Sequence, residues 1–91
     1  MFNINNNDYK VIKNYRDAFD IDEVKDKITD YYDDYDYIVG DIAYNKLRLK
    51  GFYNSNNKKV KELNNIKNLD DYLNNYCAPD CRYFVLEKVN K

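Results

Sequence analysis

Hydrophobic and polar positions are most ordered between residues 35 and 53, a stretch that contains both glycines of the chain, Gly40 and Gly51. Residues 36–39 form a short β-rich run, and residues 44–52 then alternate between two kinds of side chain. A period of two predicts a strand with one buried and one solvated face. Gly40 and the aspartate that follows it have turn chemistry, so we expect a hairpin that turns at this point.

The second strand of this hairpin has two different faces. One face would carry Tyr44, Lys46, Arg48, Lys50 and Phe52, and the other Asn45, Leu47, Leu49 and Gly51. Cations at alternate positions lie about 7 Å apart along a strand, and here one aromatic residue flanks them at each end. This basic and aromatic face is the candidate binding surface of the chain.

Two stretches have helical spacing. The first helix is expected to follow a capping box formed by Asp20 and Glu23 and to reach about Tyr32. The second is expected to begin at Asn68, which can act as its cap, and to end before Pro79. The apolar stripes are Ile21, Val24, Ile28 and Tyr31 or Tyr32 in the first helix, and Leu69, Tyr72, Leu73, Tyr76 and Cys77 in the second.

Strands are also expected near both ends of the chain. Tyr9–Tyr15 alternates loosely and follows residues 1–7, which we expect to be flexible. Arg82–Val89 has apolar side chains on both faces, which is typical of a central strand. Lys58–Ile66 could form a helical turn or a short edge strand. The sequence therefore predicts one α+β domain over residues 1–91, in which two helices pack on a small, mostly antiparallel sheet of about four strands.

Composition narrows the class of protein. The chain has 91 residues, of which 44% are hydrophobic, and 11 of these hydrophobic residues are tyrosines. This composition favours one folded domain with a thin core. The net charge is −1, but residues 1–42 carry eleven acidic and five basic side chains, whereas residues 43–91 carry five acidic and ten basic ones. The two halves could form opposite poles or pair with each other.

Localisation follows from what the chain lacks. No stretch approaches the ~20 apolar residues of a transmembrane helix, and the first residues do not resemble a signal peptide. Without a secretory signal, two cysteines indicate free thiols in a reducing compartment. We therefore expect a cytoplasmic protein.

Three separated segments resemble one protein family. They read YDYIVGD, YNKLRLKGFY and DYLNNYCAPDCRYFVL, and together they are similar to the YutD-like proteins, small cytosolic proteins of Firmicutes and Mollicutes. The resemblance covers most of residues 8–88 and implies a compact α/β domain. It implies no activity, cofactor or catalytic residue.

The basic face of the second hairpin strand could bind RNA. Lys46, Arg48 and Lys50 could follow a phosphate backbone while Tyr44 or Phe52 stacks on bases. A nearby run of lysines could extend the patch: Lys58, Lys59 and Lys61. Alternatively, the face is merely solvated and its cations pair with acidic residues of the first helix or of the hairpin loop. The chain contains no recognisable RNA-binding motif.

Cys77 and Cys81 are the only cysteines. With no histidine, the chain cannot complete a usual four-ligand zinc site alone, although a homodimer could share one. A reversible disulfide and a pair of buried thiols are the other interpretations.

Carboxylates cluster around the predicted hairpin at Asp33, Asp34, Asp36 and Asp41. Their oxygens could hold Mg²⁺ or Ca²⁺, but the spacing is not that of a calcium loop, and loop solvation and capping also explain them. The chain has no histidine, nucleotide-binding loop or nucleophile motif. We expect no catalytic residue, no cofactor and no metal.

The sequence thus predicts a non-enzymatic cytoplasmic binding module that contacts RNA or a ribonucleoprotein through residues 44–52, with no membrane partner. One alternative is a protein-interaction adaptor that uses its aromatic surface or the acidic face of the first helix, Asp22, Asp26 and Asp30. A second is a thiol- or metal-responsive regulator that uses Cys77 and Cys81.

Overall fold

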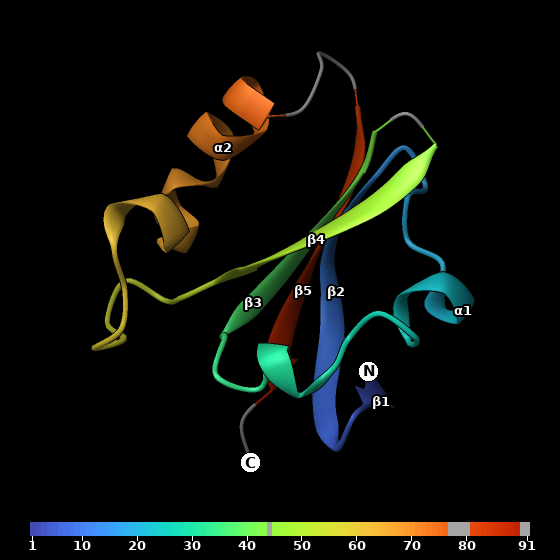
Figure 1. Cartoon of the computed structure of the whole chain (residues 1–91), viewed down its shortest axis with the longest axis horizontal. Coiled ribbons are helices and arrows are strands. Elements are labelled where there is room, and N and C mark those ends of the chain that lie inside the picture. Colours follow the sequence, from blue (N-terminus) through green and yellow to red (C-terminus); the bar gives the residue numbers. More distant parts are fainter. Residues whose placement is uncertain (44, 77–80, 90–91) are drawn as a thin grey trace.

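The computed structural model describes residues 1–43, 45–76 and 81–89. Five strands form one antiparallel sheet in the order β1-β2-β5-β3-β4 (Figure 1). The strands are β1 (Phe2–Ile4), β2 (Asn7–Tyr15), β3 (Tyr37–Ala43), β4 (Lys46–Phe52) and β5 (Arg82–Val89). The helices are α1 (Ile21–Val24) and α2 (Leu69–Tyr76), with short 3-10 helices η1 (Asp30–Tyr32), η2 (Glu62–Asn64) and η3 (Ile66–Asn68). The α+β class is confirmed, and the sheet has one strand more than expected.

The additional strand lies in the segment that we expected to be flexible. Phe2 pairs with Tyr9 across a tight turn, and Ile4 is buried. Asn5 and Asn6 make this turn with φ of 53° and 68°, a left-handed conformation that asparagine tolerates. The asparagine run at the start of the chain therefore forms a hairpin turn between β1 and β2.

The central hairpin is confirmed, but its turn is not where the glycine predicted it. Gly40 and Asp41 lie inside β3, and the chain turns between Ala43 and Lys46, where Asn45 has φ of 63°. Gly40 serves packing instead, because a Cβ at this position would overlap the ring of Phe84.

The first helix starts as predicted and ends early. The Asp20 carboxylate accepts a hydrogen bond from the Asp22 amide at 3.0 Å, which confirms this residue as the N-cap. The helix ends after one turn, and Thr29, with φ of −117° and ψ of −175°, separates it from η1. Val24 and Ile28 are buried as their spacing predicted.

The second helix is capped three residues earlier than expected. Asn65, not Asn68, accepts a hydrogen bond from the Lys67 amide at 3.1 Å and starts η3, which leads directly into α2. The ambiguous segment before it contains η2, and its only strand-like contact among the described residues is a single parallel bridge between Tyr53 and Asn65.

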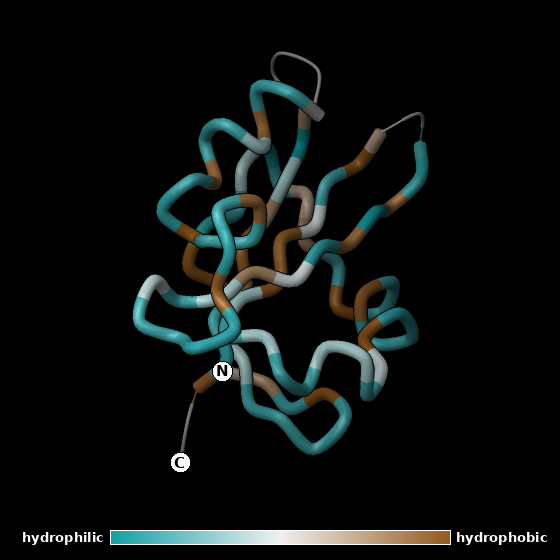
Figure 2. Tube along the Cα trace, turned by 60° about the vertical axis from the view of Figure 1, so that its left-hand side comes forward, coloured by the Kyte–Doolittle hydropathy of each residue, from teal (hydrophilic) through white to brown (hydrophobic). Residues whose placement is uncertain are grey.

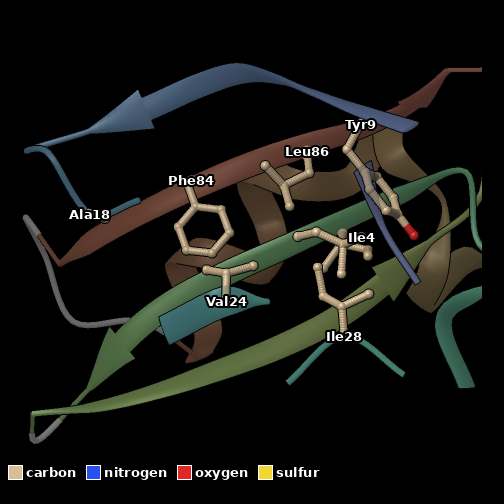
Figure 3. Packing of buried hydrophobic residues seen from close by; sticks show 8 residues of the cluster. Ile4, Tyr9, Ala18, Val24, Ile28, Phe84 and Leu86 are labelled. Atoms are coloured by element: carbon tan, nitrogen blue, oxygen red, sulfur yellow. The ribbon is translucent and has the colours of Figure 1, made fainter. Parts of the chain in front are cut away.

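Both faces of the sheet are covered, one by each helical segment. On one face, Tyr9, Ile38, Phe84 and Leu86 pack beneath α1 and the turn after it (Figure 3). On the other face, Val39, Phe52 and Val85 pack against side chains from η3 and α2: Ile66, Leu69 and Tyr72. Figure 2 shows hydrophobic stretches along the strands and mostly hydrophilic connecting loops.

The last strand is central, as its two apolar faces predicted, because β5 lies between β2 and β3. Its residues contribute to the hydrophobic cores on both faces of the sheet. Within the part of the chain that the structure describes, no helix is long and apolar enough to cross a membrane.

Candidate binding surfaces

The predicted basic face of β4 is present, but its aromatic end is buried. Lys46 is exposed, and Lys50 is half-buried. Phe52 is fully buried and packs in a T-shaped arrangement with Tyr72 on α2, with ring centres 5.5 Å apart. The hypothesis that Phe52 stacks on a base is therefore wrong, because α2 occupies that side of the ring. Tyr44 lies outside the described residues.

Arg48 is held by the protein itself. Its Nε donates to one carboxylate oxygen of Asp41 at 3.0 Å and its Nη2 to the other at 2.9 Å. Asp41 is only 1% exposed, whereas the Arg48 side chain is 48% exposed. Such a bidentate pair compensates a carboxylate that has lost its water. Arg48 thus neutralises a buried charge, which weakens it as a phosphate ligand.

Lys50 lies above two aromatic rings. Its Nζ is 5.5 Å from the centre of the Phe52 ring and 5.7 Å from that of Tyr72, within the range of a cation–π contact. The contact draws the ammonium group toward α2. Of the three predicted phosphate ligands, only Lys46 is a solvent-exposed cation with no ion pair among the described residues.

A groove of about 480 Å³ lies between the β4 edge and α2. Lys50 and Tyr72 line its inner side, and Leu63, which is 78% exposed, stands at its rim. Glu62 and Asp71 also line the groove, and neither forms an ion pair among the described residues. We call this site the β4–α2 groove. The sequence did not indicate it, because its parts are distant in the chain.

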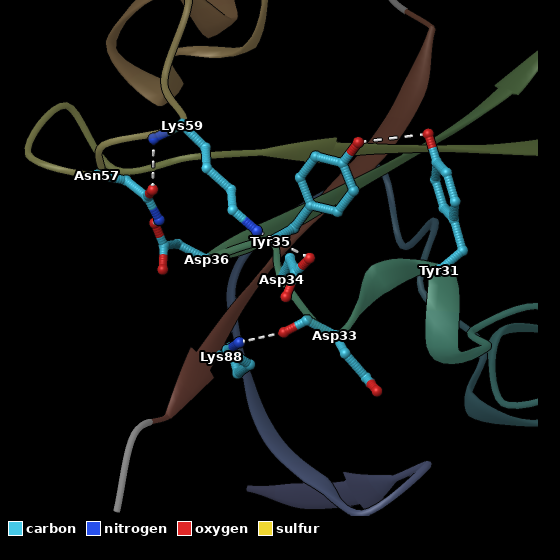
Figure 4. Close-up of polar contacts among 8 residues, drawn as sticks. All are labelled: Tyr31, Asp33, Asp34, Tyr35, Asp36, Asn57, Lys59 and Lys88. Atoms are coloured by element: carbon cyan, nitrogen blue, oxygen red, sulfur yellow. Dashed lines mark hydrogen bonds and ion pairs between the residues drawn. The ribbon is translucent and has the colours of Figure 1, made fainter.

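The carboxylates near the hairpin each bond to different residues, so these carboxylates do not converge on one site for an ion (Figure 4). Asp34 forms an ion pair with Lys59 at 3.0 Å, and this hydrogen bond raises the pKa of Lys59. Asp36 accepts hydrogen bonds from the Asn54 amide at 2.8 Å and from Asn57 at 3.1 Å. Asp33 accepts one from Asn7 at 2.7 Å. Within the described ranges, no three metal-ligating side chains come together.

The acidic face expected on the first helix does not form. Since α1 is one turn long, Asp22 and Asp30 lie in different elements. Asp22 pairs with Lys25 at 3.4 Å, and Asp30 accepts a hydrogen bond from Asn5 at 2.7 Å. Asp26 is exposed and lies between these two elements.

A cluster of tyrosines was not predicted. The Tyr35 ring stacks on Tyr53 with ring centres 4.8 Å apart. The Tyr35 hydroxyl donates to the Tyr31 hydroxyl at 3.3 Å (Figure 4). That hydrogen bond is the main cause that raises the pKa of Tyr35 to about 12. Tyr31 is 68% exposed, and Tyr32 packs edge-on against it. Gly51 admits the cluster, because a Cβ there would overlap the Tyr35 ring.

Cys81 is disulfide-bonded, which differs from the free thiols expected from composition. A disulfide sulfur is not the thiolate that binds zinc, so this form of the chain offers no thiolate at Cys81 for a shared metal site. Cys77 lies outside the described residues.

Comparison with known proteins identifies relatives over the whole chain. The family model described as "Putative antitoxin YutD-like" matches residues 3–87. "Putative antitoxin YutD" of Bacillus subtilis (strain 168) is 40% identical over 91 residues, which is 100% of both chains. The solution NMR structure of protein yutD from B. subtilis has a TM-score of 0.83 and 40% identity, and the match covers 100% of this chain and 83% of that one.

Proposed function

The chain belongs to the YutD-like family, and from this premise we propose that it is a non-enzymatic antitoxin-type protein that binds a partner protein and neutralises it. The family and the B. subtilis relative are both named "Putative antitoxin", and an antitoxin that acts on a protein toxin binds it and blocks its activity. The surface of this chain supports contact with a protein better than contact with RNA.

One observation carries the proposal: two groups that an RNA-binding face would need are used inside the fold. Arg48 compensates the buried Asp41 carboxylate, and Phe52 lies beneath α2. Two N–H groups of Arg48 are committed to Asp41, so a phosphate could reach only the remaining donors of the guanidinium. Arg48 cannot move toward a phosphate without leaving a buried charge uncompensated, which is strongly unfavourable.

Exposed apolar and aromatic side chains remain for a protein partner. Leu63 is 78% exposed beside the β4–α2 groove, and Tyr31 is 68% exposed on the tyrosine cluster. Tyrosine is enriched among the anchors of protein interfaces. An exposed leucine beside a groove adds apolar area that a partner can remove from water.

The experiment is affinity capture from a lysate of the cells that encode the chain, with and without RNase and at low and high salt. We expect a protein partner that survives RNase and high salt, because an apolar interface depends little on ionic strength whereas phosphate contacts weaken steeply. The captured partner, expressed alone in another host, should slow growth, and co-expression of the chain should restore it.

The control replaces exposed lysines that could still contact RNA: Lys58→Glu and Lys61→Glu. This double variant avoids Arg48, whose loss would disturb the fold. Partners that disappear with RNase and with this variant would favour the RNA hypothesis. Captured proteins that do not affect growth would contradict the antitoxin role.

A further inference from the structure

We propose that β4 binds an extended segment of the partner protein as a sixth strand, with one apolar side chain of that segment in the β4–α2 groove. This inference rests on the proposed function, since it states how the chain would hold its partner. Strand addition is a common mode of peptide recognition, in which main-chain hydrogen bonds supply affinity and pockets beside the edge supply specificity.

The edge of β4 is open. β4 is the last strand of the sheet, and among the described residues it pairs only with β3. One residue further on, the Tyr53 amide donates to the Asn64 carbonyl at 2.7 Å and its carbonyl accepts from the Ile66 amide at 2.9 Å. The backbone polar groups of Tyr53 therefore point away from β3.

This orientation extends along the strand, because backbone groups of alternate residues point to the same side. The carbonyl of Phe52, next to Tyr53, accepts from the Asp36 amide on the opposite side, as alternation requires. Three residues of β4 thus direct their N–H and C=O groups away from β3: Leu47, Leu49 and Gly51. Gly51 is buried, so the part of this edge that is open to a partner lies at Leu47 and Leu49.

The β4–α2 groove is placed to receive one side chain of an added strand. Lys50 belongs both to β4 and to the groove lining. A partner residue opposite Lys50, on the same face of the sheet, would stand over Leu63 and the Tyr72 ring. Glu62 and Asp71 would repel a carboxylate at this position. Lys50 would likewise repel a cation at this position, and Leu63 and the Tyr72 ring offer it apolar surface, so the side chain in the groove is apolar.

The other end of the strand favours an acidic residue. Lys46 is exposed, has no ion pair among the described residues, and lies four positions from Lys50 on the same face. A carboxylate directly opposite Lys46 would form a favourable cross-strand pair. The partner segment thus carries an apolar residue and, four positions away on the same face, Asp or Glu.

A second copy of this chain fits the edge poorly. Antiparallel pairing of β4 with itself about Arg48 would place that arginine opposite its copy and Lys46 opposite Lys50 of the copy. Like charges directly opposite are destabilising. Charge complementarity therefore selects a different protein as the occupant.

The first test uses a phage-displayed library of random ten-residue peptides and one synthetic peptide from the enriched set. We expect alternating sequences with an apolar and an acidic residue four positions apart. In NMR spectra of the complex, the amides of Leu47 and Leu49 should be slowed in hydrogen exchange. Peptides methylated at one backbone nitrogen at a time should lose binding only when the methyl group is on every second residue, since alternate amides face β4.

Matched variants test the two contacts. Leu63→Ser should weaken the peptide about tenfold, whereas Ile12→Ser, an equally conservative change at a 48% exposed residue of β2, should not. Lys46→Glu should weaken it about fivefold, the size of a cross-strand charge pair. A peptide with Lys in place of its acidic residue should recover binding to Lys46→Glu.

Each unfavourable outcome is distinct. Absence of enriched alternating peptides, or equal binding to Leu63→Ser, would overturn strand addition at β4. Self-association of the chain in sedimentation velocity, with the same two amides protected, would make a second copy the occupant and would also overturn the proposal. If a neutralised lysate partner binds Leu63→Ser and Lys46→Glu as it binds the wild type, strand addition fails and the antitoxin role stands. If no partner is neutralised, that role fails whatever the peptides show.

Discussion

The ion pair between Asp41 and Arg48 shows how one residue pair changes the functional interpretation of a strand. Both residues were predicted to be available, Asp41 as a turn or cation-binding residue and Arg48 as a phosphate ligand. Because they face each other across β3 and β4, they form a bidentate pair whose carboxylate is 1% exposed. Neither residue alone signals this pairing.

We predict that Arg48→Met lowers the free energy of unfolding by about 3 kcal/mol, because it leaves the Asp41 carboxylate buried without a partner. Urea unfolding at neutral pH measures the change. Lys46→Met on the same strand is the control and should shift stability by less than ~0.5 kcal/mol. Equal effects of the two variants would show that the ion pair contributes nothing beyond an exposed cation.

The glycines show how an element can be predicted correctly with its turn in the wrong place. Both glycines lie within strands, where each admits an aromatic ring from another segment: Phe84 over Gly40 and Tyr35 over Gly51. The hairpin itself followed from local alternation, but the contact that requires a glycine comes from residues distant in the chain.

We predict that Gly40→Ala costs about 3 kcal/mol and Gly51→Ala less, about 1 to 2 kcal/mol. Phe84 is fully buried and has no room to move, whereas Tyr35 is half-buried in a surface cluster and can rotate outward. Chemical unfolding ranks the two variants. Phe84→Leu should recover part of the loss in Gly40→Ala, and the reverse order of the two single variants would contradict this packing argument.

In the whole molecule, the fold brings charges of the two halves of the chain together and places tyrosines on both faces of the sheet. Two of the four ion pairs among the described residues join an acidic residue of the first half to a basic residue of the second: Asp41–Arg48 and Asp34–Lys59. Of the two interpretations of the charge asymmetry, pairing between the halves is therefore supported. Tyrosines lie on both faces of the sheet, and the hydroxyl of Tyr9 is buried.

The tyrosines make the molecule sensitive to alkaline pH. Burial is the main cause that raises the pKa above its ordinary value of 10.0 in three tyrosines: Tyr9, Tyr32 and Tyr37. In Tyr35 the main cause is the hydrogen bond to Tyr31, which raises its pKa to about 12. The folded state therefore holds these protons more tightly than the unfolded state does. Stability is full below about pH 10 and should fall as the pH rises toward about 12.

Urea midpoints from neutral pH to about pH 12, together with tyrosinate absorbance, measure this effect. Tyr31→Phe removes the acceptor of the Tyr35 hydroxyl, so Tyr35 should titrate at lower pH in that variant. Tyr83→Phe, outside the cluster, is the control and should leave the Tyr35 titration unchanged. A midpoint that stays constant through this range would contradict the prediction.

The sequence by itself determined the features that depend on neighbours along the chain. The α+β class, the central position of β5, the hairpin of β3 and β4, and the Asp20 cap all follow from periodicity or from a side chain within a few residues of its partner. The Asn5–Asn6 turn carried a similar local signal, which we interpreted as flexibility. Such signals are readable because strand and helix periods are fixed by backbone geometry.

Only the tertiary structure decided what covers each face. Periodicity placed Phe52 with the cations of β4 but could not show that α2 lies over its ring. It likewise could not show Arg48 facing Asp41, the tyrosines meeting above Gly51, or Leu63 at the rim of a groove beside β4. These contacts join segments that are separate in sequence, and their packing determines which side chains remain at the surface to bind a partner.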